Sequence, residues 1–201
     1  MKRFFAILAA GAMLLAATTT ATAQQRGDWQ VRGGAGVLSL PDVFGVIVVG
    51  FGSIDTSENV TSHEFVPLTS PTIEVNYWLG DKVALGGSLS VGYAAAWSTF
   101  NDSGKDSRRV SALYPTLCLS AQTRYFRKGN FMMYGSWGVG AMTMVVNQYN
   151  SDEGQNNSSL GFSMMGNLYP LGFQFGHDKA FFVELGWGAK GTLNVGGCFN
   201  F

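Results

Sequence analysis

The chain has 201 residues, enough for one domain and a leader, and its 13 basic and 13 acidic residues give a formal net charge of zero. Only 13% of the residues are charged, well below the roughly 25% of soluble domains, and 27 are glycine. The balanced charge argues against nucleic acid as a partner, and the low charge with high glycine content favours a β-protein that meets an apolar environment.

The first 23 residues have the form of a secretory signal peptide. Lys2 and Arg3 precede an apolar run at 4–17, and small residues in an A-x-A arrangement follow at 21–23. This run is shorter than the roughly 20 residues that a transmembrane helix needs. We therefore expect cleavage after Ala23, which leaves a mature domain at 24–201.

Beyond the leader, apolar and polar residues alternate with a period of two, which is typical of half-exposed β-strands. No helical period or internal repeat competes with this pattern. Pro170 removes a backbone donor and indicates a bulge or bend in its strand. We expect eight strands, at 28–38, 71–79, 82–94, 111–126, 131–146, 162–175, 181–187 and 192–201.

The connections between these strands alternate between long and short over the first six links. One tight end and one elaborated end are typical of an up-and-down transmembrane barrel. Aromatic residues also gather near the expected strand ends, as they do in the girdles at the two membrane interfaces.

The first long connection contains an apolar stretch at 41–54. Ser39 and Asp42 resemble a helix capping box and Pro41 suits a first helical turn, whereas the β-branched residues and glycines favour an extended strand. Three interpretations remain open: an interfacial helix, a plug in the barrel mouth, or a partner-binding site. We favour a short helix packed at or in the mouth.

The terminal "LNVGGCFNF" and the preceding "FFVELGWGAKGTLNVG" resemble the last strands of small outer-membrane β-barrels of Gram-negative bacteria, of the OmpA/OmpX type. The long first connection departs from the simplest members. The resemblance implies an all-β, eight-stranded antiparallel transmembrane barrel in the bacterial outer membrane. It also implies a C-terminal signal for the barrel-assembly machinery, formed by Leu193, Val195, Phe199 and Phe201.

If the apolar faces meet lipid, the opposite faces point into the lumen. A charge that faces hydrocarbon is costly, whereas in the lumen it can pair and form hydrogen bonds. We therefore expect an internal charge network of Arg32, Glu74, Arg124 and Glu184. A barrel of eight strands is narrow enough for its own side chains to fill, which argues against free ion conduction.

Cys118 and Cys198 fall on inward positions of the fourth and eighth strands. These strands lie across the barrel from each other, farther apart than the roughly 7 Å limit between the Cα atoms of a disulfide. We expect two free, buried thiols.

No catalytic, cofactor-binding or metal-binding constellation emerges. His63 has Ser62 and Glu64 as sequence neighbours, but adjacent residues of an extended chain point to opposite sides, and His177 lies in a short turn. The cysteines and histidines are scattered. We expect a non-catalytic protein with a structural or surface-interaction role.

The expected partners are outer-membrane lipid and lipopolysaccharide, with the protein a monomer. Three other functional classes remain open: a small-molecule binder or narrow channel, a lipid-modifying enzyme, and a soluble barrel of lipocalin type, in which the polar and apolar faces would be exchanged.

Overall fold

The computed structural model describes residues 26–39, 43, 60–67, 70–100, 107–150 and 155–201. The expected signal peptide and nearly all of 41–54 lie outside this part of the chain, so both stay predictions. No helix among the described residues has the length and hydrophobicity to cross a bilayer. The strands are β1 (Trp29–Val37), β2 (Val60–Pro67), β3 (Ser70–Trp78), β4 (Val83–Phe100), β5 (Ser107–Lys128), β6 (Phe131–Asn150), β7 (Gln155–Gly176), β8 (Lys179–Trp187) and β9 (Leu193–Asn200).

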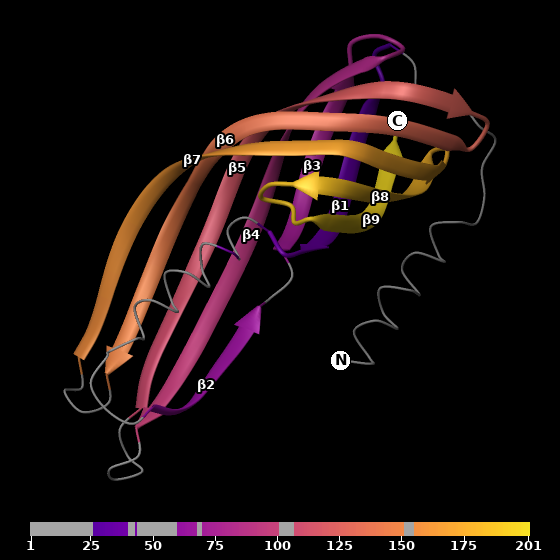
Figure 1. Ribbon diagram of the computed structural model, residues 1–201. Helices are drawn as coiled ribbons and strands as arrows, with labels where there is room; N and C mark the ends of the chain where they lie inside the picture. The colour runs from indigo at the N-terminus through magenta and orange to yellow at the C-terminus, as the bar shows by residue number, and fades with distance from the viewer. Residues whose placement is uncertain (1–25, 40–42, 44–59, 68–69, 101–106, 151–154) are drawn as a thin grey trace.

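Eight of these strands close into an antiparallel barrel, which confirms the predicted fold (Figure 1). β1 pairs with β3, and each strand from β3 to β8 pairs with the next along the chain. β9 pairs with β1, from Gln30 opposite Asn200 to Val37 opposite Leu193. The terminal strand therefore closes the barrel against the first strand, as the sequence predicts.

The long first connection contains a strand, β2, in addition to the eight that the alternation predicts. β3 pairs with β4 up to Ser90, and β2 pairs with the following part of β4, from Ala94 to Phe100. β2 and β3 thus lie in succession along one side of β4. The alternation in β2 is weak because His63 and Glu64 are adjacent polar residues in a short segment.

Four strands are much longer than predicted. β4 to β7 have 18, 22, 20 and 22 residues, whereas β1, β3 and β8 have 9 and β9 has 8. The extra length extends beyond the compact barrel on the side away from the C-terminus (Figure 1). We call this extension the protruding wall, and define it as 91–100 of β4, 107–115 of β5, 143–150 of β6 and 155–167 of β7.

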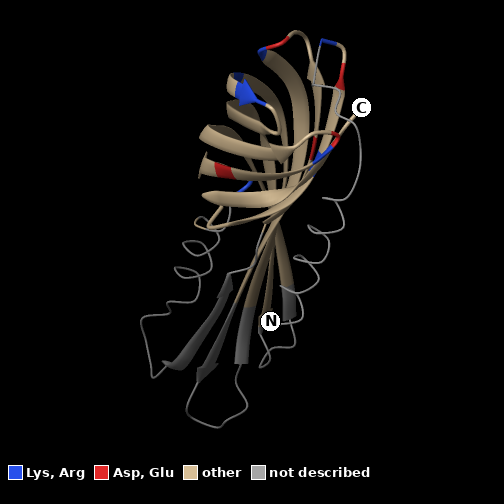
Figure 2. Cartoon of the chain, turned by 90° about the vertical axis from the view of Figure 1, so that its right-hand side faces the viewer, with Lys and Arg blue, Asp and Glu red and all other residues tan. Residues whose placement is uncertain are grey.

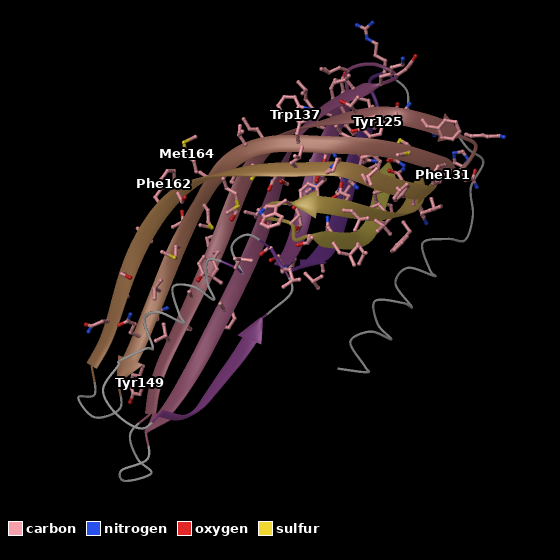
Figure 3. The ribbon with its side chains drawn as sticks, in the orientation of Figure 1. Tyr125, Phe131, Trp137, Tyr149, Phe162 and Met164 are labelled. Atoms are coloured by element: carbon pink, nitrogen blue, oxygen red, sulfur yellow. The ribbon has the colours of Figure 1, made fainter. Side chains whose placement is uncertain are left out.

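The alternation of side chains separates the two surfaces of the barrel. Along β3, exposed and buried positions alternate without a break, with Ile73, Val75 and Tyr77 outside. Figure 3 shows the outward aromatic residues Trp137 and Phe162 on β6 and β7, and Figure 2 shows charged residues gathered at the end with the short turns. Trp78, at the end of β3, points inward and is fully buried.

Candidate functional site in the barrel lumen

Four charged side chains meet inside the barrel. Arg32 Nη1 lies 2.8 Å from Glu184 Oε1 and 3.3 Å from Glu74 Oε1. Lys190 Nζ lies 2.7 Å from Glu74 Oε2 and 3.0 Å from Glu184 Oε2. Each carboxylate therefore contacts both cations, and the four charges cancel. All four side chains are at most 3% exposed.

Neutral side chains complete this charge network. Tyr134 Oη donates to Glu184 Oε1 at 3.1 Å and also contacts Arg32 Nη2. The amides of Asn76 and Asn194 donate to Glu74 and Glu184 at 2.6 and 2.9 Å. These bonds matter because a buried ion pair offsets its desolvation cost only when its remaining hydrogen-bonding capacity is well satisfied.

Lys190 enters the lumen from the connection between β8 and β9, which folds inward. Its backbone N–H donates to Tyr169 Oη at 3.0 Å, and the N–H of Ala189 donates to Asn167 Oδ1 at 2.7 Å. Gly188 and Gly191 flank this turn with φ angles of +151° and +97°. Such angles suit glycine because it has no Cβ, so the segment "GAKG" is built to make this inward turn.

The first strand leaves room for the turn. A Cβ added at Gly36 would lie 1.6 Å from the carbonyl oxygen of Lys190, so only glycine fits there. The Lys190 side chain contacts the carboxylates of both Glu74 and Glu184, so the position of this turn is tied to the charge network.

The structure brings three of the four predicted residues together and places Arg124 elsewhere. Arg32, Glu74 and Glu184 meet, whereas Arg124 lies 4.2 Å from the ring centroid of Trp78 and its Nε contacts Met132 Sδ at 3.2 Å. Alternation along a strand fixes the face of a residue but leaves its height along the barrel undetermined. Arg124 has the predicted face and sits toward the short turns, at a bulge between Arg124 and Phe126.

Lys190 lies in a turn and not at an alternating strand position, so the alternation of residues does not predict that it enters the lumen. The two glycines that flank it distinguish the segment, because "GAKG" differs in composition from the polar turns elsewhere in the chain. A solvated loop can have the same four residues, so this segment alone does not predict an inward turn. Only the closure of β9 on β1 brings this turn over Gly36 and the carboxylates.

A layer of amide side chains lies next to the charge network, on the side of the short turns. Gln30 Nε2 donates to Gln174 Oε1 at 3.0 Å and to Asn200 Oδ1 at 2.9 Å. Asn76 Nδ2 lies 3.4 Å from Gln30 Oε1 and 3.5 Å from Gln122 Oε1. These side chains come from β1, β3, β5, β7 and β9, so the layer spans the lumen.

Clusters of buried apolar side chains lie on both sides of these polar layers. Toward the short turns, Trp78, Ala84 and Met132 pack together. Toward the protruding wall, the buried side chains of a second cluster are mostly small or flexible: Ala94, Val110, Ala112, Tyr114, Cys118, Met142, Val146, Met165 and Ala189. Both cysteines are free and buried, in agreement with the prediction.

This arrangement binds the lumen side chains to one another. Among the described residues, no group of three or more histidine, cysteine, aspartate or glutamate side chains is placed to hold a metal ion. Each carboxylate of the charge network contacts two cations and an amide. These ion pairs therefore cross-link β1, β3, β8 and the β8–β9 turn through the lumen.

Comparison with known proteins finds no matching family model and no matching curated protein. Solved structures do match. The N-terminal β-barrel domain of Pseudomonas aeruginosa OprF has 15% identity and a TM-score of 0.48, covering 89% of this chain and 100% of that one. Ail, the attachment invasion locus protein of Yersinia pestis, has 14% identity and a TM-score of 0.41, covering 88% and 100%. The outer membrane protein OprG from Pseudomonas aeruginosa has 12% identity and a TM-score of 0.37, covering 89% and 98%.

Proposed function

We propose that this chain is an integral protein of the Gram-negative outer membrane, with a structural or surface-interaction role and a lumen closed by its own side chains. The observation that carries the proposal is the polarity of the barrel, which is inverted relative to a soluble protein. Four of its charged side chains are buried inside, while large apolar side chains on its outer surface are exposed, including Leu119 at 73% and Leu168 at 60%. An apolar exterior requires a lipid environment.

The aromatic residues at the short-turn end support the same proposal. Trp29 and Tyr77 contact each other with ring centroids 5.0 Å apart, and Phe131 contacts Phe173 and Phe175 at 6.2 and 5.3 Å. Aromatic rings at one level of a barrel mark a membrane interface. The short turns and both ends of the mature chain would then face the periplasm.

Heat-modifiable migration on a detergent gel tests membrane insertion. The folded barrel should migrate faster than the boiled protein, and it should require detergent for extraction from membranes. A protein that is soluble without detergent and migrates equally before and after boiling would contradict the proposal and favour a lipocalin-type barrel.

Planar-bilayer recording tests the closed lumen. The charge network and the amide layer cross-link the strands across the barrel, so we expect no steady single-channel conductance. A stable conductance from the purified wild-type protein would instead favour the narrow channel.

We also propose that the protein is not an enzyme, because the buried charged side chains in the described part of the lumen pair with one another. Mass spectrometry of lipid A from cells that express the chain should show unchanged acylation. Loss or addition of an acyl chain would contradict this and favour a lipid-modifying enzyme.

The proposed partners are outer-membrane lipid and lipopolysaccharide. During biogenesis, the barrel-assembly machinery is a further proposed partner.

A further inference from the structure

Sulfur-containing side chains gather in the lumen on the side of the protruding wall. Cys118 of β5, Met142 of β6 and Met165 of β7 belong to one cluster of buried side chains, and Met144 packs against it. We call Cys118, Met142 and Met165 the sulfur triad. Its members lie on three neighbouring strands, so the fold brings together residues that are far apart in the sequence.

The pairing of these strands places the thiol and one thioether on either side of a glycine. Gly140 of β6 pairs with Cys118 on one side and with Met165 on the other. A Cβ added at Gly140 would lie 2.5 Å from Cys118 Sγ, so the thiol lies over this glycine. The Cα atoms of residues separated by one strand are about 9–10 Å apart. Gly140 has no side chain, so it does not fill the space between Cys118 and Met165.

Met142 brings a second thioether to the same place. It lies two residues beyond Gly140 on β6, and residues two apart on a strand share a face. The methionine side chain is unbranched and has three rotatable bonds, so its sulfur atom can adjust its position. One thiol and two thioethers therefore converge on the inner face of β6.

A polar side chain is directed at the thiol. Asn167, which is buried, forms a hydrogen bond with the side chain of Cys118. Asn167 Oδ1 accepts the N–H of Ala189 at 2.7 Å, so the NH₂ group of Asn167 is the part that faces the sulfur atom. An N–H donor stabilises a thiolate more than a thiol. Outer hydrogen bonds of this kind orient the ligands of metal sites.

We propose that the sulfur triad binds one soft monovalent metal ion, Cu(I), through the Cys118 thiolate and the thioethers of Met142 and Met165. Thiolate and thioether ligands select Cu(I) over harder cations. When the ion binds, the S–H bond of Cys118 breaks, its proton passes to water and a sulfur–copper bond forms, with no change in oxidation state. The thiolate and the ion then cancel in charge. A divalent ion would leave one positive charge uncompensated among apolar side chains, which is costly.

The inner face of the protruding wall provides a route for the ion. Met144 is half-buried and follows Met142 on the same face of β6. Ser159 and Ser163 of β7 are exposed, and Ser163 lies opposite Met142 on this inner face. An ion that enters from the wall therefore meets the Met144 thioether before it reaches the sulfur triad. This inference goes beyond the proposed structural role and does not depend on it.

Competition with a Cu(I) chelator tests the site in the full-length protein. In a Cys198→Ser background, the folded protein in detergent is titrated without oxygen with Cu(I) buffered by bicinchoninate. We expect one ion per chain. Met165→Leu removes one thioether at nearly constant volume. It should weaken binding by at least the roughly tenfold that the loss of an outer-shell partner costs.

Met164→Leu is the matched control, because Met164 is the sequence neighbour of Met165 on the opposite face of β7. It is 81% exposed on the outer side of the strand (Figure 3). This variant should bind Cu(I) as tightly as the parent protein. Equal affinities of the Met164→Leu and Met165→Leu variants would overturn the proposal, because copper would then bind without the Met165 thioether.

Two further measurements identify the ligands. Cys118→Ser should abolish binding at the chelator concentration that the parent protein withstands, and circular dichroism shows that this variant is folded. X-ray absorption at the copper edge should show sulfur as the coordinating element. Binding that survives Cys118→Ser, a shell of nitrogen or oxygen ligands, or a folded parent protein that binds no copper would each contradict the site.

Discussion

At the scale of single residues, Lys190 decides whether the charge network is neutral. In Lys190→Gln, Glu74 and Glu184 share Arg32 alone, which leaves one uncompensated buried charge. Breaking a buried ion pair from one side costs about 3–5 kcal/mol. We expect the free energy of unfolding in urea, measured in lipid vesicles, to fall by that amount. Lys179→Gln, in an exposed position at the start of β8, should change it little.

A compensating variant separates charge balance from packing. Lys190→Met combined with Glu74→Gln restores neutrality and keeps an oxygen near the Asn76 amide, which donates to Glu74 at 2.6 Å. The double variant should recover most of the lost free energy of unfolding. If it is as unstable as Lys190→Gln, the turn contributes through its shape and not through its charge.

Gly36 provides a test of that shape. Gly36→Ala places a methyl group where the Lys190 carbonyl oxygen lies, so the turn must move, at a cost of about 1–3 kcal/mol. Gly33 lies on the same strand with no atom within 4 Å of an added Cβ. Gly33→Ala should therefore be neutral in the same urea titration. Equal effects of the two substitutions would contradict the close approach of the turn to β1.

At the scale of elements, β9 combines a structural role with a predicted targeting role. The backbone of Phe201 bonds to that of Trp29 in both directions, at 2.6 and 2.9 Å, and these bonds do not depend on the side chain. Phe201 is 71% exposed as a whole residue. Phe201→Asp should therefore lower the amount of protein assembled in the outer membrane of cells while the purified chain still refolds in detergent.

Phe175→Asp is the matched control for that experiment. Phe175 is also an exposed aromatic residue at the short-turn end, but it lies on β7, outside the terminal strand. It should assemble better in cells than Phe201→Asp. Equal assembly of the two variants would refute a targeting role for the terminal phenylalanine.

The strands show what alternation along the chain can and cannot predict. It identified the inward face of Arg32, Glu74 and Glu184, because a period of two is set by the backbone of a single strand. The heights of inward residues along the barrel depend on the register between strands, so alternation does not separate Arg124, near the short turns, from the other three. The wall was underestimated because serine-rich and asparagine-rich strand ends have the composition of loops.

At the scale of the whole molecule, the barrel combines a short half and a tall half. β1, β3, β8 and β9 end near the level of the charge network, whereas β4 to β7 continue into the wall. The polar lumen is cross-linked where all eight strands are present. The wall continues from this cross-linked base along β4 to β7.

The position of the membrane along the barrel can be tested with paired substitutions on the outer surface. Ile73 lies in the middle of β3, is 60% exposed and pairs with Gly33 and Leu89. Tyr149 is 48% exposed near the far end of β6 in the wall (Figure 3). An arginine on the lipid face costs about 2–4 kcal/mol at the bilayer midplane and about 0–1 kcal/mol near the interface.

Ile73→Arg should therefore lower the free energy of unfolding in phosphatidylcholine vesicles by several-fold more than Tyr149→Arg. In detergent micelles, where the apolar layer adapts its shape, the difference should shrink. Equal costs in vesicles would mean that the membrane reaches the wall. The backbone of 155–167 of β7, which pairs with β6 alone among the described strands, would then lie in hydrocarbon, where unpaired backbone groups are not tolerated.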